Sequence, residues 1–132
     1  MSGKIPAYKV YEDNNTLAFL DINPLSKGHT LVIPKMHVRQ IEELSEKELE
    51  ILFKTVWKLT KYVQIATGTA SSLIGINNGP ESGQEIPHIH VHIIPRSKGD
   101  GGGPIHSAMR NRPTVSKEEM QKIVESIISV LK

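Results

Sequence analysis

Three short stretches near the beginning of the chain carry the alternating, β-branched pattern that is typical of β-strands. They span residues 8–12, 16–22 and 29–34. The turn signal Asp13-Asn14-Asn15 separates the first two, and Pro34 ends the third. The pattern therefore predicts three consecutive strands that are joined as a meander.

The spacing of apolar residues changes to a helical period after the third strand. Ser45 and Glu48 have capping-box spacing, and Gly68 is suited to end a helix. The apolar face between them consists of Leu49, Leu52, Phe53, Val56, Leu59, Val63 and Ala66. A second capping-box spacing, at Ser116 and Glu119, precedes another apolar face, made of Met120, Ile123, Val124, Ile127, Ile128 and Leu131. We expect two amphipathic helices that pack these faces inward.

Residues 71–76 and 87–96 again have the composition of strands. The order strand-strand-strand-helix-strand-strand-helix indicates an α+β fold. Its five-stranded sheet is expected to be mainly antiparallel, with one long central helix and a C-terminal helix. The length of 132 residues fits a single domain, residues 1–132. Residues from about 97 to 113 have no regular pattern and are rich in glycine, so we expect a flexible loop there.

The strand expected at residues 87–96 contains three alternating histidines between two prolines. On a strand, His88, His90 and His92 share one face, and the intervening apolar residues face the core. Three imidazoles in a row bury little apolar area and lose solvation if they are covered. We therefore interpret this row as a functional site. From the spacing alone it fits a nucleophile or general base, a metal site or the polar face of an exposed strand.

Composition narrows the possible partners. The 16 basic and 14 acidic residues give a formal charge of +2 and are interspersed, which argues against nucleic-acid binding. No apolar run approaches the ~20 residues of a membrane span, and the chain does not begin with a signal-peptide pattern. We therefore expect a cytoplasmic protein with no membrane partner. The chain has no cysteine, so His37 has no cysteine pair for a metal site and is interpreted as a surface residue.

The turn-rich segment before the histidines, residues 77–84, offers backbone N–H groups and amide side chains that suit a phosphate. Gly83-Gln84 followed by three histidines alternating with apolar residues resembles the histidine triad (HIT) family of nucleotidyl hydrolases and transferases. The resemblance implies a homodimer whose sheets join across the interface, and it implies neither a cofactor nor a protein-bound metal. It also implies cleavage of a purine nucleotide at the α-phosphate, through a covalent nucleotidyl-histidine that releases a nucleoside monophosphate.

The resemblance also implies roles for individual residues. His90 matches the nucleophile, His88 orients the strand and the His90 ring, and His92 contacts phosphate oxygens. His29 matches a fourth histidine beside the triad. The residues that match the nucleotide-binding positions are Phe19 and Ile22 at the base, Asp21 at the ribose, and Asn77, Gly83, Gln84 and Glu85 at the phosphate and leaving group.

One position departs from the family's pattern. Glu85 stands where the family usually has serine or threonine, and an ionised carboxylate accepts hydrogen bonds but cannot donate one to a leaving group. Two alternatives to the nucleotide hydrolase stay open. One is a metalloenzyme with histidine ligands, which the spacing of the histidines also fits. The other is a nucleotide-binding regulator with little turnover, which the departure at Glu85 suggests.

Overall fold

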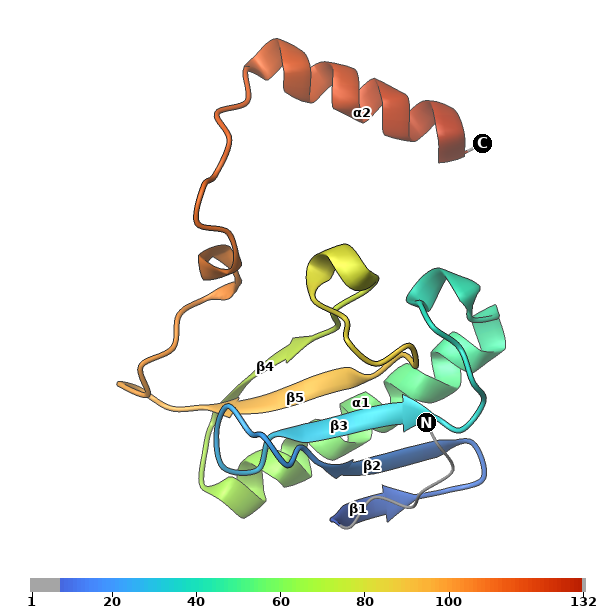
Figure 1. Cartoon of the computed structure of the whole chain (residues 1–132), viewed down its shortest axis with the longest axis vertical. Coiled ribbons are helices and arrows are strands. Elements are labelled where there is room, and N and C mark those ends of the chain that lie inside the picture. The colour runs from blue at the N-terminus through green and yellow to red at the C-terminus, as the bar shows by residue number, and fades with distance from the viewer. Residues whose placement is uncertain (1–7, 132) are drawn as a thin grey trace. The chain divides into compact units, whose positions relative to one another are not determined.

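The computed structural model describes residues 8–131, which form two compact units that divide between Asp100 and Gly101. The first unit contains a five-stranded sheet in the order β1-β2-β3-β5-β4, in which every neighbouring pair is antiparallel. The strands are β1 (Lys9–Glu12), β2 (Thr16–Leu20), β3 (Thr30–Pro34), β4 (Ser71–Gly75) and β5 (Val91–Arg96) (Figure 1). The antiparallel sheet of the first unit and the two α-helices of the described residues confirm the α+β expectation.

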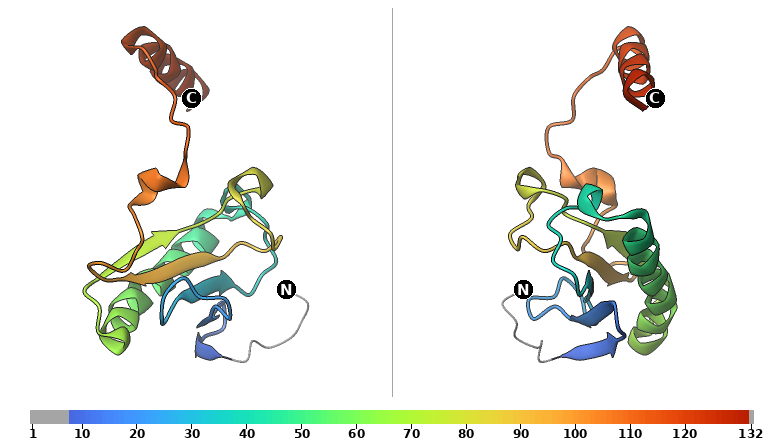
Figure 2. Two further views of the ribbon diagram at one scale, coloured as in Figure 1. Left: turned by 60° about the vertical axis from the view of Figure 1, so that its left-hand side comes forward. Right: turned by 90° about the vertical axis from the view of Figure 1, so that its right-hand side faces the viewer.

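Helix α1 (Glu46–Thr67) covers one face of this sheet, as the side view in Figure 2 shows. It begins with the predicted capping box of Ser45 and Glu48. It ends at Gly68, whose φ of 69° lies in the left-handed region that glycine adopts without a steric clash because it has no Cβ. The core lies between α1 and the sheet and consists of Ala18, Val32, Leu52, Val56, Leu59, Val91 and Ile93. The opposite face of the sheet is consequently available for a site.

The prediction of a strand from residue 87 was wrong at its beginning, because β5 starts only at Val91. The neighbouring strand β3 ends at Pro34, and the Pro34 carbonyl accepts a hydrogen bond from the His88 ring rather than from a strand backbone. The N–H of Ile89 donates to the carbonyl of Val38 at 2.7 Å, outside the regular ladder. Two of the three histidines therefore precede the strand.

The second unit contains a 3₁₀ turn at Ile105–Ala108 and helix α2 (Lys117–Leu131). The Glu119 N–H donates to the Ser116 hydroxyl at 3.1 Å, at the position where the sequence predicts a helix start. The apolar side chains of α2 were expected to face inward, but those of Met120, Ile123, Val124, Ile127, Ile128 and Leu131 are exposed. That residues 1–132 form a single domain stays a prediction. None of the helices in residues 8–131 has the length and apolar character needed to cross a bilayer.

Candidate active site

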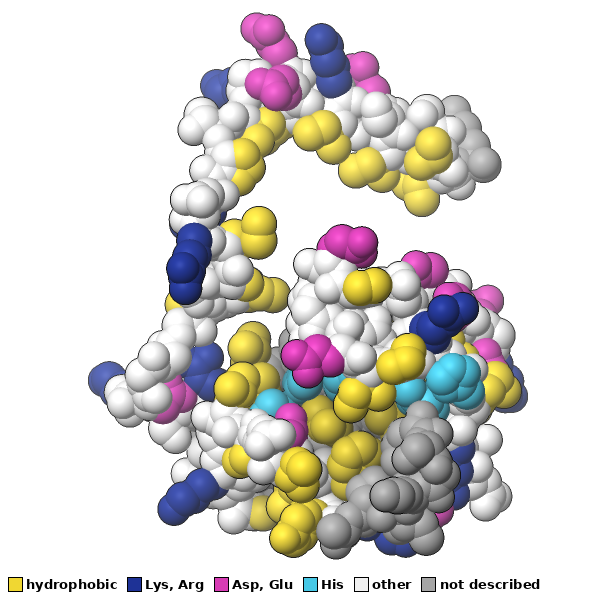
Figure 3. All heavy atoms as spheres, viewed as in Figure 1, with side chains coloured by type: hydrophobic (Ala, Val, Ile, Leu, Met, Phe, Trp, Pro, Cys, Tyr) yellow, Lys and Arg dark blue, Asp and Glu magenta, His cyan; other side chains and the backbone are white. Residues whose placement is uncertain are grey.

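A row of side chains crosses the sheet on the face opposite α1. Phe19 of β2 pairs with Leu31 of β3, and Leu31 pairs with His92 of β5. Directly paired residues share a face, and the adjacent row of Ala18, Val32 and Val91 belongs to the core under α1. Phe19 and His92 therefore lie on the site face, where Figure 3 shows histidines surrounded by hydrophobic side chains. Ile22, just beyond β2, is exposed.

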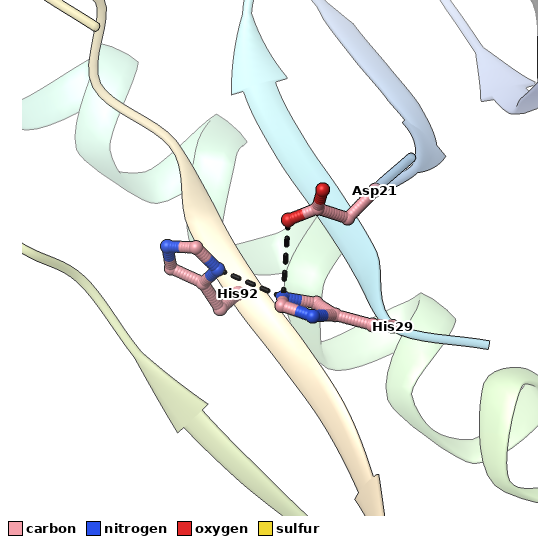
Figure 4. Close-up of side chains that lie close together, drawn as sticks. All are labelled: Asp21, His29 and His92. Atoms are coloured by element: carbon pink, nitrogen blue, oxygen red, sulfur yellow. Dashed lines mark hydrogen bonds and ion pairs between the residues drawn. The ribbon is translucent and has the colours of Figure 1, made fainter. Parts of the chain in front are cut away.

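Asp21, His29 and His92 come together on this face although they come from three different parts of the chain (Figure 4). His29 is buried, and its Nε2 lies 2.9 Å from Nδ1 of His92. Asp21 Oδ2 lies 3.8 Å from the same His29 nitrogen, which is too long for a hydrogen bond. Asp21 Oδ1 accepts the N–H of Asn23 at 2.8 Å, which holds the carboxylate at the end of β2.

The hydrogen bonds determine which nitrogen of each ring carries the proton. The backbone N–H of Leu25 donates to His29 Nδ1 at 3.1 Å, so a neutral His29 has its proton on Nε2. That proton is donated to His92 Nδ1, and a neutral His92 therefore carries its own proton on Nε2. This Nε2 is buried and has no hydrogen-bond partner among residues 8–131. The site thus contains a desolvated N–H donor that is ready for an acceptor.

The middle histidine has the opposite tautomer. His90 Nδ1 lies 2.9 Å from the carbonyl oxygen of His88, and a carbonyl can only accept, so Nδ1 carries the proton. The lone pair of a neutral His90 is then on Nε2. Its ring centroid lies 5.0 Å from that of His92. A nucleophilic or basic nitrogen and a hydrogen-bond donor are therefore neighbours in this site.

His88 is buried, and its ring contacts the backbone at the end of β3. Its Nε2 donates to the carbonyl of Pro34 at 2.8 Å, which leaves its lone pair on Nδ1. His37 was interpreted as a surface residue, and its side chain is exposed, but its Nδ1 lies 3.3 Å from His88 Nδ1. His37 is therefore a contact of the triad and not an isolated surface histidine.

The loop that the sequence assigns to phosphate binding is held by its own glutamine. The Gln84 side chain accepts from Gly79 N–H at 2.8 Å and donates to the carbonyls of Arg39 and Ile86 at 2.8 and 3.0 Å. Gly79 and Gly83 have φ values of 95° and 100°, a conformation that favours glycine at both positions. Asn77 and Glu85, the two other residues assigned to this loop, are exposed.

The same geometry bears on the metalloenzyme alternative. Within residues 8–131, the side chains of Asp21, His29 and His92 form a group whose donor atoms lie within 4.8 Å of one another. A metal ligand needs a lone pair on the donor atom. In the neutral rings His29 Nε2 carries a proton, and the lone pair of His92 Nδ1 accepts that proton. Binding of a cation to these two nitrogens would break the hydrogen bond from His29 Nε2 to His92 Nδ1 and, by moving the His29 proton to Nδ1, the hydrogen bond from the Leu25 N–H. These residues therefore fit a hydrogen-bonded chain better than a metal site.

Burial keeps the imidazole rings of His29, His88 and His92 neutral. It lowers the pKa of His92 from the ordinary value of 6.5 to about 4, and the neighbouring His90 and His29 rings contribute to the shift. Burial also lowers the pKa of His29, against the attraction of Asp21, and the pKa of His88. His92 therefore remains an N–H donor without charge at neutral pH.

These shifts predict how stability depends on pH. Between pH 6.5 and about 4 the unfolded chain binds more protons at His92 than the folded chain does, so the free energy of unfolding should fall as pH falls through this window. Urea unfolding at pH values near 7 and near 5 measures the fall. His92→Asn should reduce the difference between the two values. His106→Asn, which replaces an exposed ring in the second unit, should leave it unchanged.

Some contacts of the site have no recognisable signal in the sequence. The N–H of Leu25 selects the His29 tautomer, and Leu31 lies between Phe19 and His92. His37 reaches His88 because β3 and β5 are antiparallel neighbours, which brings the residues after β3 beside those before β5. Knowledge of the strand order would have predicted the last two contacts.

Comparison with known proteins identifies the family of this chain. The HIT domain family matches residues 2–99, and the chain belongs to this family. The adenosine 5'-monophosphoramidase of Schizosaccharomyces pombe is 38% identical over 132 residues, which cover 100% of this chain and 94% of that protein. The asymmetrical bis(5'-nucleosyl)-tetraphosphatase of the same organism is 40% identical over 90 residues, or 68% of this chain and 50% of that protein. A solved HIT family structure from Bacillus subtilis has a TM-score of 0.82 at 38% identity, and the match covers 97% of this chain and 90% of that chain.

Proposed function

We propose that this protein is a nucleotidyl hydrolase or transferase that cleaves a purine nucleotide at the α-phosphate. The observation that carries the proposal is the opposite tautomers of His90 and His92, which set a nitrogen lone pair beside a desolvated N–H donor. Displacement at phosphorus needs both, because a nucleophile must attack while the charge on the phosphate oxygens is stabilised. The named activities of the two Schizosaccharomyces pombe relatives support a nucleotide as the substrate.

The reaction proceeds in two displacements. His90 Nε2 attacks the α-phosphorus, a phosphorus–nitrogen bond forms, and the bond to the leaving group breaks as that group takes up a proton from the solvent. Water then attacks the nucleotidyl-histidine, gives up a proton to the solvent, releases the nucleoside monophosphate and restores the neutral ring. The His92 Nε2–H donates to a phosphate oxygen in both steps. His29 positions His92 by donating to its Nδ1, and the His88 carbonyl accepts from His90 Nδ1 and so keeps Nε2 available.

The remaining residues hold the nucleotide. The Asp21 carboxylate accepts the ribose hydroxyls, while Phe19 and Ile22 contact the base. Asn77, Gly83 and Glu85 contact the phosphate and the leaving group, and Gln84 acts through its hold on the loop. The substrate is a nucleoside phosphoramidate or a dinucleoside polyphosphate, and the divergence at Glu85 affects the leaving group and not the phosphate that is attacked.

We also propose that the protein is a homodimer. Strands β1 and β4 are the edges of the sheet, and an edge strand offers unpaired backbone groups to another chain. Light scattering at micromolar concentration should give twice the monomer mass of 14.7 kDa. The cytoplasmic location stays a prediction.

A panel of substrates tests the proposed function. Nucleoside phosphoramidates and dinucleoside polyphosphates should be turned over with release of a nucleoside monophosphate, and turnover of the phosphoramidates should survive treatment with a chelator. Phosphoramidates are the better test of metal dependence because polyphosphates bring their own divalent ions. Loss of this activity on chelation, with recovery on adding zinc, would favour the metalloenzyme. Tight binding of a monophosphate without turnover of any substrate would favour the regulator.

A further inference from the structure

A glycine is the cross-strand neighbour of His92 on the site face of the sheet. Gly75 of β4 is directly paired with His92 of β5, and directly paired residues share a face. The row across this face therefore runs from Phe19 through Leu31 and His92 to Gly75. A side chain at Gly75 would have its Cβ about 5 Å from that of His92. Gly75 thus stands at the outer end of the row, on the edge strand β4.

The fold does not require a glycine at this position. The φ of Gly75 is not positive, so a residue with a side chain can adopt the same backbone conformation. The pairing of β4 with β5 is continuous from Ser71 to Gly75, without a bulge. A Cβ added at Gly75 would have no heavy atom within 4 Å among residues 8–131, apart from those of its two chain neighbours. Since valine or isoleucine would favour a strand more than glycine does, the missing side chain leaves space that the fold itself does not use.

The His92 donor is directed toward the side of the ring on which Gly75 lies. Nδ1 of His92 faces His29, which directly precedes β3 (Figure 4). Nε2 is on the other side of the ring, and β5 lies between β3 and β4, so Nε2 is on the β4 side. This Nε2 is the buried donor without a partner among residues 8–131. A group that accepts its proton will therefore lie next to the space at Gly75.

The strand order sets the direction in which a bound nucleotide crosses the face. Phe19 and Asp21, which the proposed function places at the base and the ribose, come from β2 and from the residue just beyond it. His90 and His92, at the phosphate, come from β5 and from the residue just before it. Strand β4 lies on the far side of β5 from β2. The group that leaves the α-phosphate is therefore expected over β4, the strand that contains Gly75.

We propose that Gly75 determines the size of the leaving group that the site accepts. Without a side chain on this position, a leaving group much larger than ammonia fits beside His92 and over β4. The proposal rests on the proposed function and adds to it a selection by leaving-group size. A side chain at Gly75 would occupy the same space and exclude large leaving groups, while the nucleophile and the His92 donor would remain.

The test adds a side chain at this position. Gly75→Ala adds one methyl group, and Gly75→Val fills more of the space beside His92. Ser71→Val is the matched control, because Ser71 lies on the same face of β4 but pairs with Arg96 at the other end of the strand. The substrates keep one nucleoside and differ in the amine that leaves. One is adenosine 5'-phosphoramidate, which releases ammonia, and the other carries a large aromatic amine.

The measured quantity is the ratio of kcat/KM for the two substrates, which a general loss of activity does not change. Gly75→Val should lower kcat/KM for the aromatic amide by roughly tenfold or more, because pocket shape discriminates substrates by size. It should lower kcat/KM for the unsubstituted phosphoramidate much less. Gly75→Ala should shift the ratio in the same direction by a smaller factor. Ser71→Val should leave the ratio at the wild-type value.

Stability and assembly are measured on the same variants. Thermal unfolding should show that Gly75→Val is folded, since valine favours a strand, and if it does not fold, Gly75→Ala provides the same ratio. An unchanged ratio in folded variants would overturn the proposal. So would a changed molecular mass in light scattering without a changed ratio, because a second chain at the edge strand β4 would then fill the space.

Binding separates failure of this proposal from failure of the proposed function. If the wild-type chain turns over neither substrate, the proposed function fails, and calorimetry with AMP and ATP then tests the space alone. The outer phosphates of ATP extend beyond the α-phosphate, where a leaving group would lie. Gly75→Val should therefore weaken binding of ATP more than binding of AMP. Equal changes for the two nucleotides, or no nucleotide binding by the wild-type chain, would overturn the role of Gly75.

Discussion

Replacement of His90 by alanine is expected to lower kcat by several orders of magnitude for every nucleotide substrate. The substitution removes the nitrogen that attacks phosphorus, and with it the whole two-step route. A phosphorus–nitrogen bond is labile in acid and survives alkali. Quenching the wild-type reaction in base, with a substrate labelled at the α-phosphate, should therefore leave label on the protein. His90→Ala should retain none.

Binding separates loss of the nucleophile from loss of the site. His90→Ala should still bind a nucleoside monophosphate in calorimetry, because Asp21, Phe19 and the loop that ends at Glu85 remain in place. The His90 ring is only partly buried, so thermal unfolding should change little. Near-normal turnover in His90→Ala, with abolished turnover in His88→Ala or His92→Ala, would show that another histidine is the nucleophile.

Replacement of His92 by alanine is expected to have the second largest effect. His92 Nε2–H is a buried donor without a partner among residues 8–131, so its desolvation cost is already met before substrate arrives. Loss of one such preorganised donor to a phosphate oxygen costs roughly a hundredfold in kcat. The variant should still form the alkali-stable nucleotidyl-protein, at a lower rate, because the nucleophile is untouched. Rapid-quench measurement of the labelled protein gives that rate.

Two variants make the assignment specific. His92→Gln, whose side-chain amide nitrogen can reach the position of Nε2, keeps an N–H donor there and should retain more activity than His92→Ala. His29→Ala removes the donor to His92 Nδ1, which allows the His92 proton to move to the wrong nitrogen, so it should reduce kcat although His29 does not touch phosphate. If His92→Ala were as inactive as His90→Ala and formed no labelled protein, the donor role of His92 would be excluded.

Local patterns along the chain were sufficient to predict the elements of the fold. Ser45, Glu48 and Gly68 mark the ends of α1 in the sequence, and they mark them in the structure because capping depends only on neighbouring backbone atoms. The alternation of residues 89–93 likewise predicted which side chains turn toward α1, and Val91 and Ile93 are in the core. The order of strands and helices followed from the same short-range signals.

The alternation was less informative about the histidines themselves. It placed His88, His90 and His92 on one strand face, whereas only His92 lies in β5. The difference arises from long-range contacts, since Pro34 and Val38 occupy the hydrogen-bonding groups of His88 and Ile89. A pattern of side-chain polarity contains no information about which distant carbonyl will accept a given N–H.

The sequence by itself determined the histidine residues, their family and the α+β order of elements, because these depend on residue identity and on short-range periodicity. The tertiary structure alone decided the protonation of each ring. The Leu25 N–H selects the tautomer of His29, and His29 in turn selects the tautomer of His92. The carbonyl of His88 selects the tautomer of His90. A neutral imidazole has one nitrogen that donates and one that accepts. Only the partner that the fold brings within hydrogen-bond distance determines which nitrogen donates and which accepts. The antiparallel pairing of β3 with β5 is the step that brings His29 and His92 together.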